Sequence, residues 1–182
     1  MAFVRKAWYV AGWSSEFGND LGTVKILDQN IVMYRTSKGQ VIAMEDRCPH
    51  RFLPLSMGKL IGDDIQCGYH GITYNCEGLC VRIPGQKKIQ KTLNVPTYPV
   101  HEKHDIVCIW MGENSLAETS EIFDIPQFSQ SGWEVNQGEA VHLNSNYLYV
   151  AENFVDPAHV SFVLPTTLGS SASEDVPVEF KT

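Results

Sequence analysis

In Cys48-Pro49-His50-Arg51, and again in Cys67-Gly68-Tyr69-His70-Gly71, one cysteine and one histidine lie close together in the chain. Sixteen residues separate His50 from Cys67. Each stretch therefore offers one thiolate and one imidazole. Four ligands from two loops are expected to hold one metal centre.

The order of the ligands separates the candidate metal centres. A zinc finger usually places two cysteines on one loop and two histidines on the other. Here each loop gives one of each, which favours a two-iron cluster in which one iron binds both sulfurs and the other binds both nitrogens. A structural zinc site, or loop residues with no shared role, remain the alternatives.

The pattern Cys48-x-His50 and Cys67-x-x-His70 resembles the Rieske [2Fe-2S] motif, and the residues around it resemble those of Rieske oxygenases. The resemblance implies that Cys48, His50, Cys67 and His70 bind the cluster. The chain has no spare cysteine between Cys48 and Cys67 for the disulfide of high-potential Rieske proteins. It therefore resembles the lower-potential branch, towards the bottom of a range of about −150 to +300 mV.

The remaining cysteines are expected to stay free thiols. Cys76 and Cys80 lie on either side of Glu77-Gly78, which is typical of a hairpin turn, and no obvious partner would complete a metal site with them. A reducing compartment would leave them, and Cys108, unpaired.

Composition indicates an intracellular protein without a membrane span. The 182 residues carry a net charge of −7, which argues against nucleic acid as a partner. The longest wholly apolar run, 106–111, is too short to cross a bilayer. The N-terminal residues make a poor signal peptide. We therefore expect a soluble, cytoplasmic protein that does not bind membranes.

The pattern of residues predicts a mainly β fold. Alternating apolar runs bounded by turn residues indicate an antiparallel β domain over 1–112. A polar connector is expected over 113–132. The connector is followed by strand-like alternation from Trp133 to Asn144 and by helical spacing from Ser145 to Val163. The strands expected in the first domain lie within 3–13, 23–27, 30–36, 40–45, 72–75, 79–83, 95–100 and 106–111.

A second motif, Asn153-x-x-Asp156-x-x-His159, places its three residues on one side of a helix. It resembles the segment that opens the α+β, helix-grip-like catalytic domain of Rieske oxygenases. The resemblance implies that His159 is a ligand of a mononuclear iron. It also implies that Asp156 bridges the cluster to that iron, and that Asn153 lies beside it. The implied iron site has two histidines and one carboxylate, with positions left open for O₂.

The iron site departs from the family pattern at Leu164. The family's second histidine is expected five residues after His159, and leucine has no donor atom. The carboxylate ligand normally comes much further along the chain. The resemblance thus covers the first half of an oxygenase subunit, so that 133–182 would begin a truncated catalytic domain. The chain is expected to be incomplete for catalysis.

The nearest resemblance is to the branch of vanillate demethylase, dicamba demethylase and toluenesulfonate methyl-monooxygenase. It implies an electron donor (a reductase or ferredoxin), a small aromatic substrate, Fe(II) beside the [2Fe-2S] cluster, and a homotrimer in which His70 of one subunit reaches Asp156 of the next. The alternative hypothesis is a Rieske ferredoxin-like electron carrier without oxygenase chemistry. The stretch after Gly112, which includes the second motif, argues against it.

Overall fold

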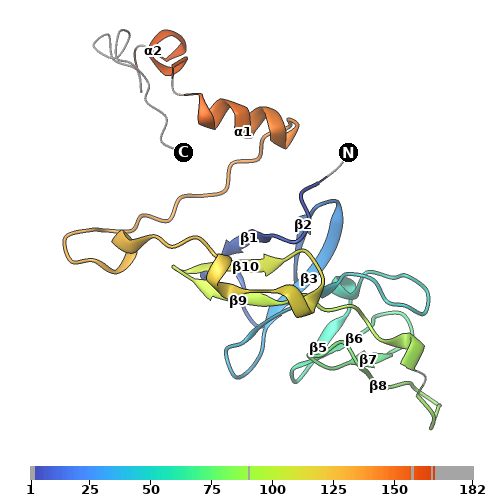
Figure 1. The fold of residues 1–182 in the computed structure, drawn as a ribbon. Coiled ribbons are helices and arrows are strands. Elements are labelled where there is room, and N and C mark those ends of the chain that lie inside the picture. Colours follow the sequence, from blue (N-terminus) through green and yellow to red (C-terminus); the bar gives the residue numbers. More distant parts are fainter. Residues whose placement is uncertain (1–2, 90, 157, 165, 167–182) are drawn as a thin grey trace. The chain divides into compact units, whose positions relative to one another are not determined.

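The computed structural model describes residues 3–89, 91–156, 158–164 and 166, and the chain divides into two compact units, 1–137 and 138–182. The first unit consists of antiparallel sheets and short 3₁₀ helices, and the second contains two short α-helices (Figure 1). The fold is therefore mainly β, as the sequence predicts. None of the helices in the described residues is long and apolar enough to cross a membrane.

A central sheet has both of its faces buried. Side chains alternate along strands β3 and β4, so that Ile31 and Met33 enter one core while Val32 and Tyr34 enter another. This explains the unbroken apolar runs in these strands, which are 31–34 in β3 and 41–44 in β4. The strands of this sheet are β2 (Gly22–Ile26), β3 (Gln29–Arg35) and β4 (Val41–Glu45).

A second sheet packs against one face of the central sheet. Val107 and Ile109 of β10 enter the same core as Ile31 and Met33. Its strands, in spatial order, are β1 (Trp8–Trp13), β10 (Ile106–Trp110) and β9 (Val100–Lys103).

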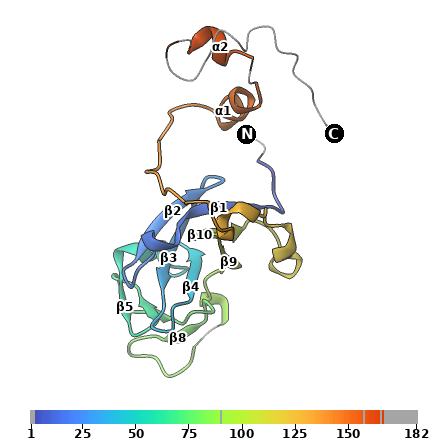
Figure 2. The ribbon, with the colours of Figure 1, turned by 90° about the vertical axis from the view of Figure 1, so that its left-hand side faces the viewer.

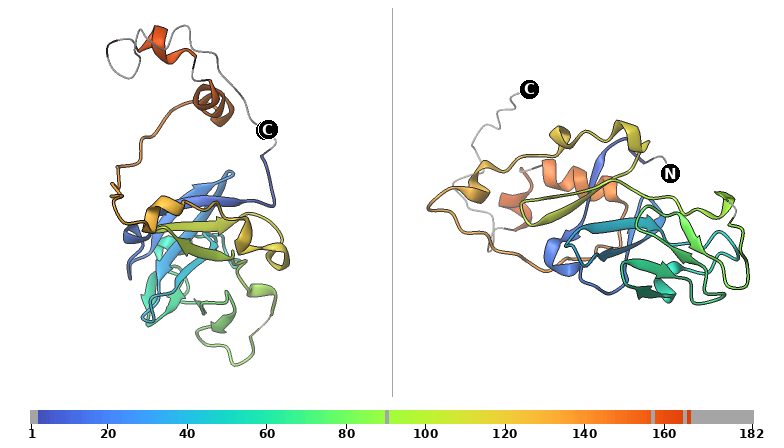
Figure 3. Two further views of the ribbon diagram at one scale, coloured as in Figure 1. Left: turned by 60° about the vertical axis from the view of Figure 1, so that its left-hand side comes forward. Right: turned by 90° about the horizontal axis from the view of Figure 1, so that it is seen from below.

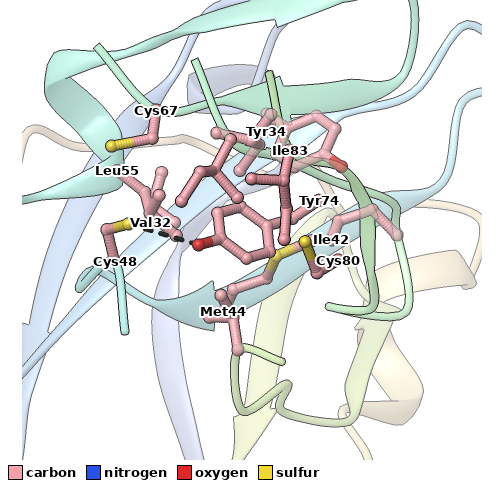
Figure 4. Close-up of a cluster of buried hydrophobic side chains, with 13 residues drawn as sticks. Val32, Tyr34, Ile42, Met44, Cys48, Leu55, Cys67, Tyr74, Cys80 and Ile83 are labelled. Atoms are coloured by element: carbon pink, nitrogen blue, oxygen red, sulfur yellow. Dashed lines mark hydrogen bonds between the residues drawn. The ribbon is translucent and has the colours of Figure 1, made fainter. Parts of the chain in front are cut away.

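The third sheet packs against the other face of the central sheet and carries the cysteine and histidine loops. Its core contains Cys48, Cys67 and Tyr74 together with Val32 and Tyr34 (Figure 4). Figures 2 and 3 show this sheet at the end of the unit away from β1 and β10. Its strands are β5 (Lys59–Ile61), β6 (Asp64–Gln66), β7 (Thr73–Tyr74) and β8 (Cys80–Arg82).

The strand predicted at 95–100 is wrong, because β9 begins at Val100. Pro96 and Pro99 have no N–H group to donate to a ladder, and this segment makes only an isolated bridge, between Met44 and Thr97. The turn between β9 and β10 consists of His104 and Asp105, both with φ of 56°.

The strand-like segment predicted from Trp133 to Asn144 is also wrong, because no strand forms there in the described residues. Alternation alone does not make a strand without a partner for its backbone. The predicted helix is two helices, α1 (Tyr147–Val155) and α2 (Val160–Val163). Pro157, between the two helices, lies outside the described residues, as do 167–182. The 3₁₀ helices are η1 (Ser14–Glu16), η2 (Leu55–Met57), η3 (Lys91–Leu93), η4 (Asn114–Leu116), η5 (Thr119–Glu121) and η6 (Pro126–Ser129).

Candidate metal centre

The first loop is closed by two backbone hydrogen bonds. The Cys48 N–H donates to the Leu53 carbonyl at 2.9 Å, and the Phe52 N–H donates to the Cys48 carbonyl at 2.8 Å. Phe52 has a φ of +61°, which is uncommon for an aromatic residue, and the Arg47 guanidinium lies 3.9 Å from the centre of its ring. These two bonds hold Cys48 at the base of the loop, and His50 lies in the chain between Cys48 and Phe52.

The second loop repeats this pattern. The Cys67 N–H donates to the Ile72 carbonyl at 2.8 Å, and the Gly71 N–H donates to the Cys67 carbonyl at 3.1 Å. Gly71 takes the position of Phe52, with a φ of +68°. The Pro84 ring lies against Gly71, since a Cβ added there would be 3.3 Å from Pro84 Cγ. Two structurally equivalent loops thus present one cysteine and one histidine each.

The four side chains divide into a buried sulfur pair and an exposed imidazole pair. Cys48 and Cys67 are each 2% exposed, and both belong to the same core (Figure 4). His50 and His70 are exposed, with ring centres 4.6 Å apart. Pairing sulfur with sulfur and nitrogen with nitrogen fits a two-iron cluster that has a different ligand pair on each iron. These residues therefore fit a Rieske cluster in chemistry and in arrangement.

The backbone around Cys67 favours a charged sulfur. Burial raises the pKa of the Cys67 thiol, while the N–H groups of Tyr69 and His70, which point at its sulfur, lower it. Hydrogen bonds to the charged form offset part of the cost of burying it, although the pKa of Cys67 stays above its usual value. Bound iron would add its own positive charge, so the same N–H groups would face a thiolate ligand.

A contact that the sequence did not predict joins Tyr74 to Cys48. The Tyr74 hydroxyl lies 3.2 Å from Cys48 Sγ, and the side chain is completely buried. Burial, followed by the hydrogen bond to Cys48, raises the pKa of Tyr74, so the hydroxyl keeps its proton. An iron-bound sulfur has no proton, and Tyr74 would then be the donor.

We expect Tyr74→Phe to lower the reduction potential of the cluster. Reduction adds negative charge to the cluster, so a hydrogen bond donated to Cys48 Sγ strengthens on reduction and favours the reduced form. Its loss should lower the potential by about 60 mV if the bond differs by about 1.4 kcal/mol between the two states. Potentiometric titration followed by absorbance measures this.

Tyr34→Phe is the matched control. Tyr34 is as deeply buried in the same core, but its hydroxyl donates to the Asp63 carbonyl at 2.7 Å. Its removal should leave the potential unchanged. An equal shift in both variants would mean that core packing, and not the bond to Cys48, sets the potential.

The other cysteines lie outside the two loops. Cys76 Sγ donates to the Asp63 carbonyl at 3.4 Å, and Cys80 and Cys108 are buried thiols. Across the described residues, no three cysteine, histidine, aspartate or glutamate side chains form a group that could hold a single metal ion.

The second motif comes together at the end of α1. The Asn153 amide nitrogen lies 3.3 Å from His159 Nε2, and Asp156 Oδ2 lies 3.4 Å from His159 Nδ1. Asp156 Oδ1 also accepts the Ala158 N–H at 3.1 Å. The three residues are therefore neighbours, although the helix ends at Val155 and does not run through them. Leu164 follows α2, and its N–H donates to the Val160 carbonyl.

Comparison with known proteins identifies the class to which this geometry belongs. Residues 7–99 match the family model of the Rieske [2Fe-2S] domain. The chain belongs to this family, and a [2Fe-2S] cluster is its cofactor.

Several of the relatives are oxygenase components. The chain is 37% identical over 172 residues to the iron-sulfur subunit of the toluene-4-sulfonate monooxygenase system of Comamonas testosteroni, covering 94% of this chain and 49% of that protein. It is 37% identical to the oxygenase component of dicamba O-demethylase from Stenotrophomonas maltophilia, and the match covers 90% of this chain and 48% of that protein. A crystal structure of dicamba monooxygenase bound to dicamba superposes with a TM-score of 0.87 at 34% identity, over 94% of this chain and 52% of that one. The chain spans about half the length of the curated relatives it matches.

Proposed function

We propose that this chain is the N-terminal part of the terminal component of a Rieske oxygenase. Cys48, His50, Cys67 and His70 hold the [2Fe-2S] cluster, which supplies one-electron chemistry when bound. The observation that carries the proposal is the division into buried cysteines and exposed histidines. The protein seals the sulfur side from water and leaves the imidazole edges open to a partner.

The domain boundaries follow from this role. Residues 1–112 form the Rieske domain, 113–132 connect, and 133–182 begin the catalytic domain. In a complete oxygenase subunit, His159 would supply one ligand to a mononuclear iron, Asp156 would link His70 of a neighbouring subunit to that iron, and Asn153 would orient His159. The 3.3 Å contact between Asn153 and His159 supports the positioning role.

The substrate class is inferred from the relatives. Their names include toluene-4-sulfonate monooxygenase, vanillate O-demethylase and dicamba O-demethylase. We propose a small aromatic compound whose ring substituent is oxidised, with electrons supplied by a reductase or ferredoxin in the cytoplasm. A Rieske ferredoxin-like carrier is the second candidate. The grouping of Asn153, Asp156 and His159 favours the oxygenase, because a carrier has no use for it.

The oxygenase and the electron-carrier hypotheses predict different oligomeric states. We expect cluster-loaded protein to sediment as a trimer, with Asp156 accepting a hydrogen bond from His70 of the next subunit. Asp156→Ala should raise the dissociation constant at each subunit interface of the trimer at least about tenfold, because a hydrogen bond to a charged group contributes about 1.5–3 kcal/mol. Analytical ultracentrifugation over a range of concentrations measures it.

Glu152→Ala is the control for this substitution. Glu152 is an exposed carboxylate on α1, four residues before Asp156. Its removal changes the net charge equally and should leave the trimer unchanged. Wild-type protein that remains a monomer at high concentration would favour the carrier hypothesis.

A further inference from the structure

The connector is attached to the sheet of β1, β10 and β9 by side chains of that sheet. The Trp8 indole N–H donates to the Glu118 carbonyl at 2.9 Å, and Lys103 Nζ donates to the Ile122 carbonyl at 3.3 Å. Lys103 Nζ also lies 3.0 Å from Asp124 Oδ1. Three successive points of the connector are therefore fixed to the Rieske domain.

The next point of attachment is a single nitrogen atom that has two partners. His104 Nε2 accepts a hydrogen bond from the Ile125 N–H at 3.1 Å, and it also lies 3.1 Å from Asp124 Oδ1. An imidazole nitrogen either carries a proton and donates, or has a lone pair and accepts. The Ile125 N–H needs an acceptor, whereas the Asp124 carboxylate needs a donor. His104 Nε2 can therefore bond only one of these partners at a time.

The His104 ring is confined between the β9–β10 turn and the connector. His104 begins this turn with a φ of +56°, and its side chain is 15% exposed. Its ring centre lies 4.8 Å from that of Phe128 in η6. Both candidate partners already lie within hydrogen-bond distance, so Nε2 can change from one to the other without a large movement of the ring.

This attachment borders a cavity of about 470 Å³ between the sheet and the connector. Trp8 and Ile106 line it from the sheet, and Ile122 and Ile125 line it from the connector, with His104 among the polar residues. Because Ile125 forms part of the apolar lining, a change in its backbone hydrogen bond acts on packed structure and not on a solvated loop.

The charged groups near His104 in the described part of the chain are Lys103, Asp105, Glu121 and Asp124. Lys103, followed by His104, lowers the pKa of Asp124. The stabilisation from this ionised carboxylate is present above its ordinary pKa of about 4, and it is lost only when the pH falls through the lowered value. Between pH 5 and pH 8, His104 is therefore the member of this group whose charge is expected to change.

We propose that His104 is a pH-dependent switch in how the connector is attached to the Rieske domain. When the ring is neutral, Nε2 accepts the Ile125 N–H and holds the connector by its backbone. When the ring takes a proton from solvent, Nε2–H donates to Asp124, and the Ile125 N–H loses its acceptor. One proton thus moves the point of attachment by one residue and loosens the start of η6. The inference does not depend on the proposed oxygenase function.

The test follows the Ile125 amide by NMR in the oxidised, cluster-loaded chain from pH 8 to pH 5. We expect this amide resonance to titrate with the same midpoint as the imidazole resonances of His104. Its hydrogen-exchange protection factor, taken relative to an unfolded chain at the same pH, should fall about fivefold towards pH 5, because one hydrogen bond is lost. The Leu116 amide, which donates to the Glu113 carbonyl at 3.0 Å, is the internal control and should keep its protection.

His104→Gln separates the hydrogen bond from the titration. A glutamine amide oxygen accepts hydrogen bonds and does not change charge, so it can accept the Ile125 N–H at every pH in this range. We expect the Ile125 amide to keep the same protection from pH 8 to pH 5 in this variant. A pH response that persists without the imidazole would overturn the proposal.

Asp124→Asn tests the partner of the protonated ring. The midpoint of the Ile125 response should fall by about half a pH unit or more, because the charged imidazole loses a carboxylate partner. Asp105→Asn is the matched control, since it removes the same charge from the next residue of the turn, and asparagine tolerates the positive φ found there. Equal shifts in the two variants would show that the general field of the carboxylates, and not the contact with Asp124, sets the midpoint.

Two results with the wild-type chain would also contradict the switch. An Ile125 amide with the same protection at pH 8 and pH 5 would show that Nε2 does not change partners. Loss of protection at Leu116 in step with Ile125 would show that acid loosens the whole connector. Absorbance recorded at each pH shows whether the cluster stays bound, so loss of the cluster is distinguished from either result.

Discussion

Cys48→Ser and Cys67→Ser proteins are each expected to purify without visible absorption, with essentially all cluster iron and acid-labile sulfide lost. A serine oxygen is a poorer donor to cluster iron than a thiolate. The loops themselves should survive, because backbone hydrogen bonds and not the sulfurs close them. Far-ultraviolet circular dichroism should therefore remain close to that of wild type while the absorbance is lost.

Cys80→Ser is the matched control for these two variants. Cys80 is 7% exposed and belongs to the same core, but it lies on β8, outside both loops. Its pKa is raised by burial, as expected of a thiol that stays protonated. The variant should keep full colour, as should Cys76→Ser. Bleaching in either would mean that the ligands have been misassigned.

The cluster loops could be predicted because their chemistry is local in sequence. Within each loop, the cysteine and the histidine are only two or three residues apart in the sequence, Cys48 with His50 and Cys67 with His70. This spacing alone distinguishes a mixed ligand set from that of a zinc finger. Strands β3 and β4 were predictable for a related reason. Their β-branched residues and flanking turns mark strands whatever they pack against.

Other features depend on partners that are distant in the chain. The bond from Tyr74 to Cys48 spans 26 positions, and no local pattern predicts it. The hairpin of β5 and β6 was also not predicted, although Gly62-Asp63, between Ile61 and Asp64-Ile65, is a turn signal that could have revealed it. The positive φ of Phe52 is set by the closing bonds of its loop and not by the residue itself.

The segment after the connector shows the opposite error, in which a local pattern predicts structure that requires a partner. Residues 133–144 alternate like a strand, but no strand is formed over these residues. The grouping of Asn153, Asp156 and His159 was anticipated from helical spacing, yet it forms where the helix ends. The His159 side chain contacts Asp156 and Asn153 across the end of α1, and these contacts, not the helical periodicity, bring the residues together.

The last prediction concerns the mononuclear iron site. The 182-residue polypeptide, loaded with iron and sulfide, is expected to contain two irons per chain and no stoichiometric third iron. His159 offers one nitrogen, and Leu164 offers none at the position of the family's second histidine. Iron held by an incomplete ligand set binds weakly and is lost during purification. Leu164→His alone should therefore leave the count at two.

The same substitution should act differently when the carboxylate ligand is present. In a polypeptide extended by the C-terminal half of a relative, Leu164→His should raise the iron count to three and permit substrate-dependent O₂ uptake. Thr166→His, which places a histidine two residues further on at an exposed position, is the control. It should leave the iron count at two and permit no O₂ uptake. A third tightly held iron in the unmodified polypeptide would contradict the assignment of Leu164 as the missing ligand position. It would also mean that His159 shares its iron with side chains outside the motif.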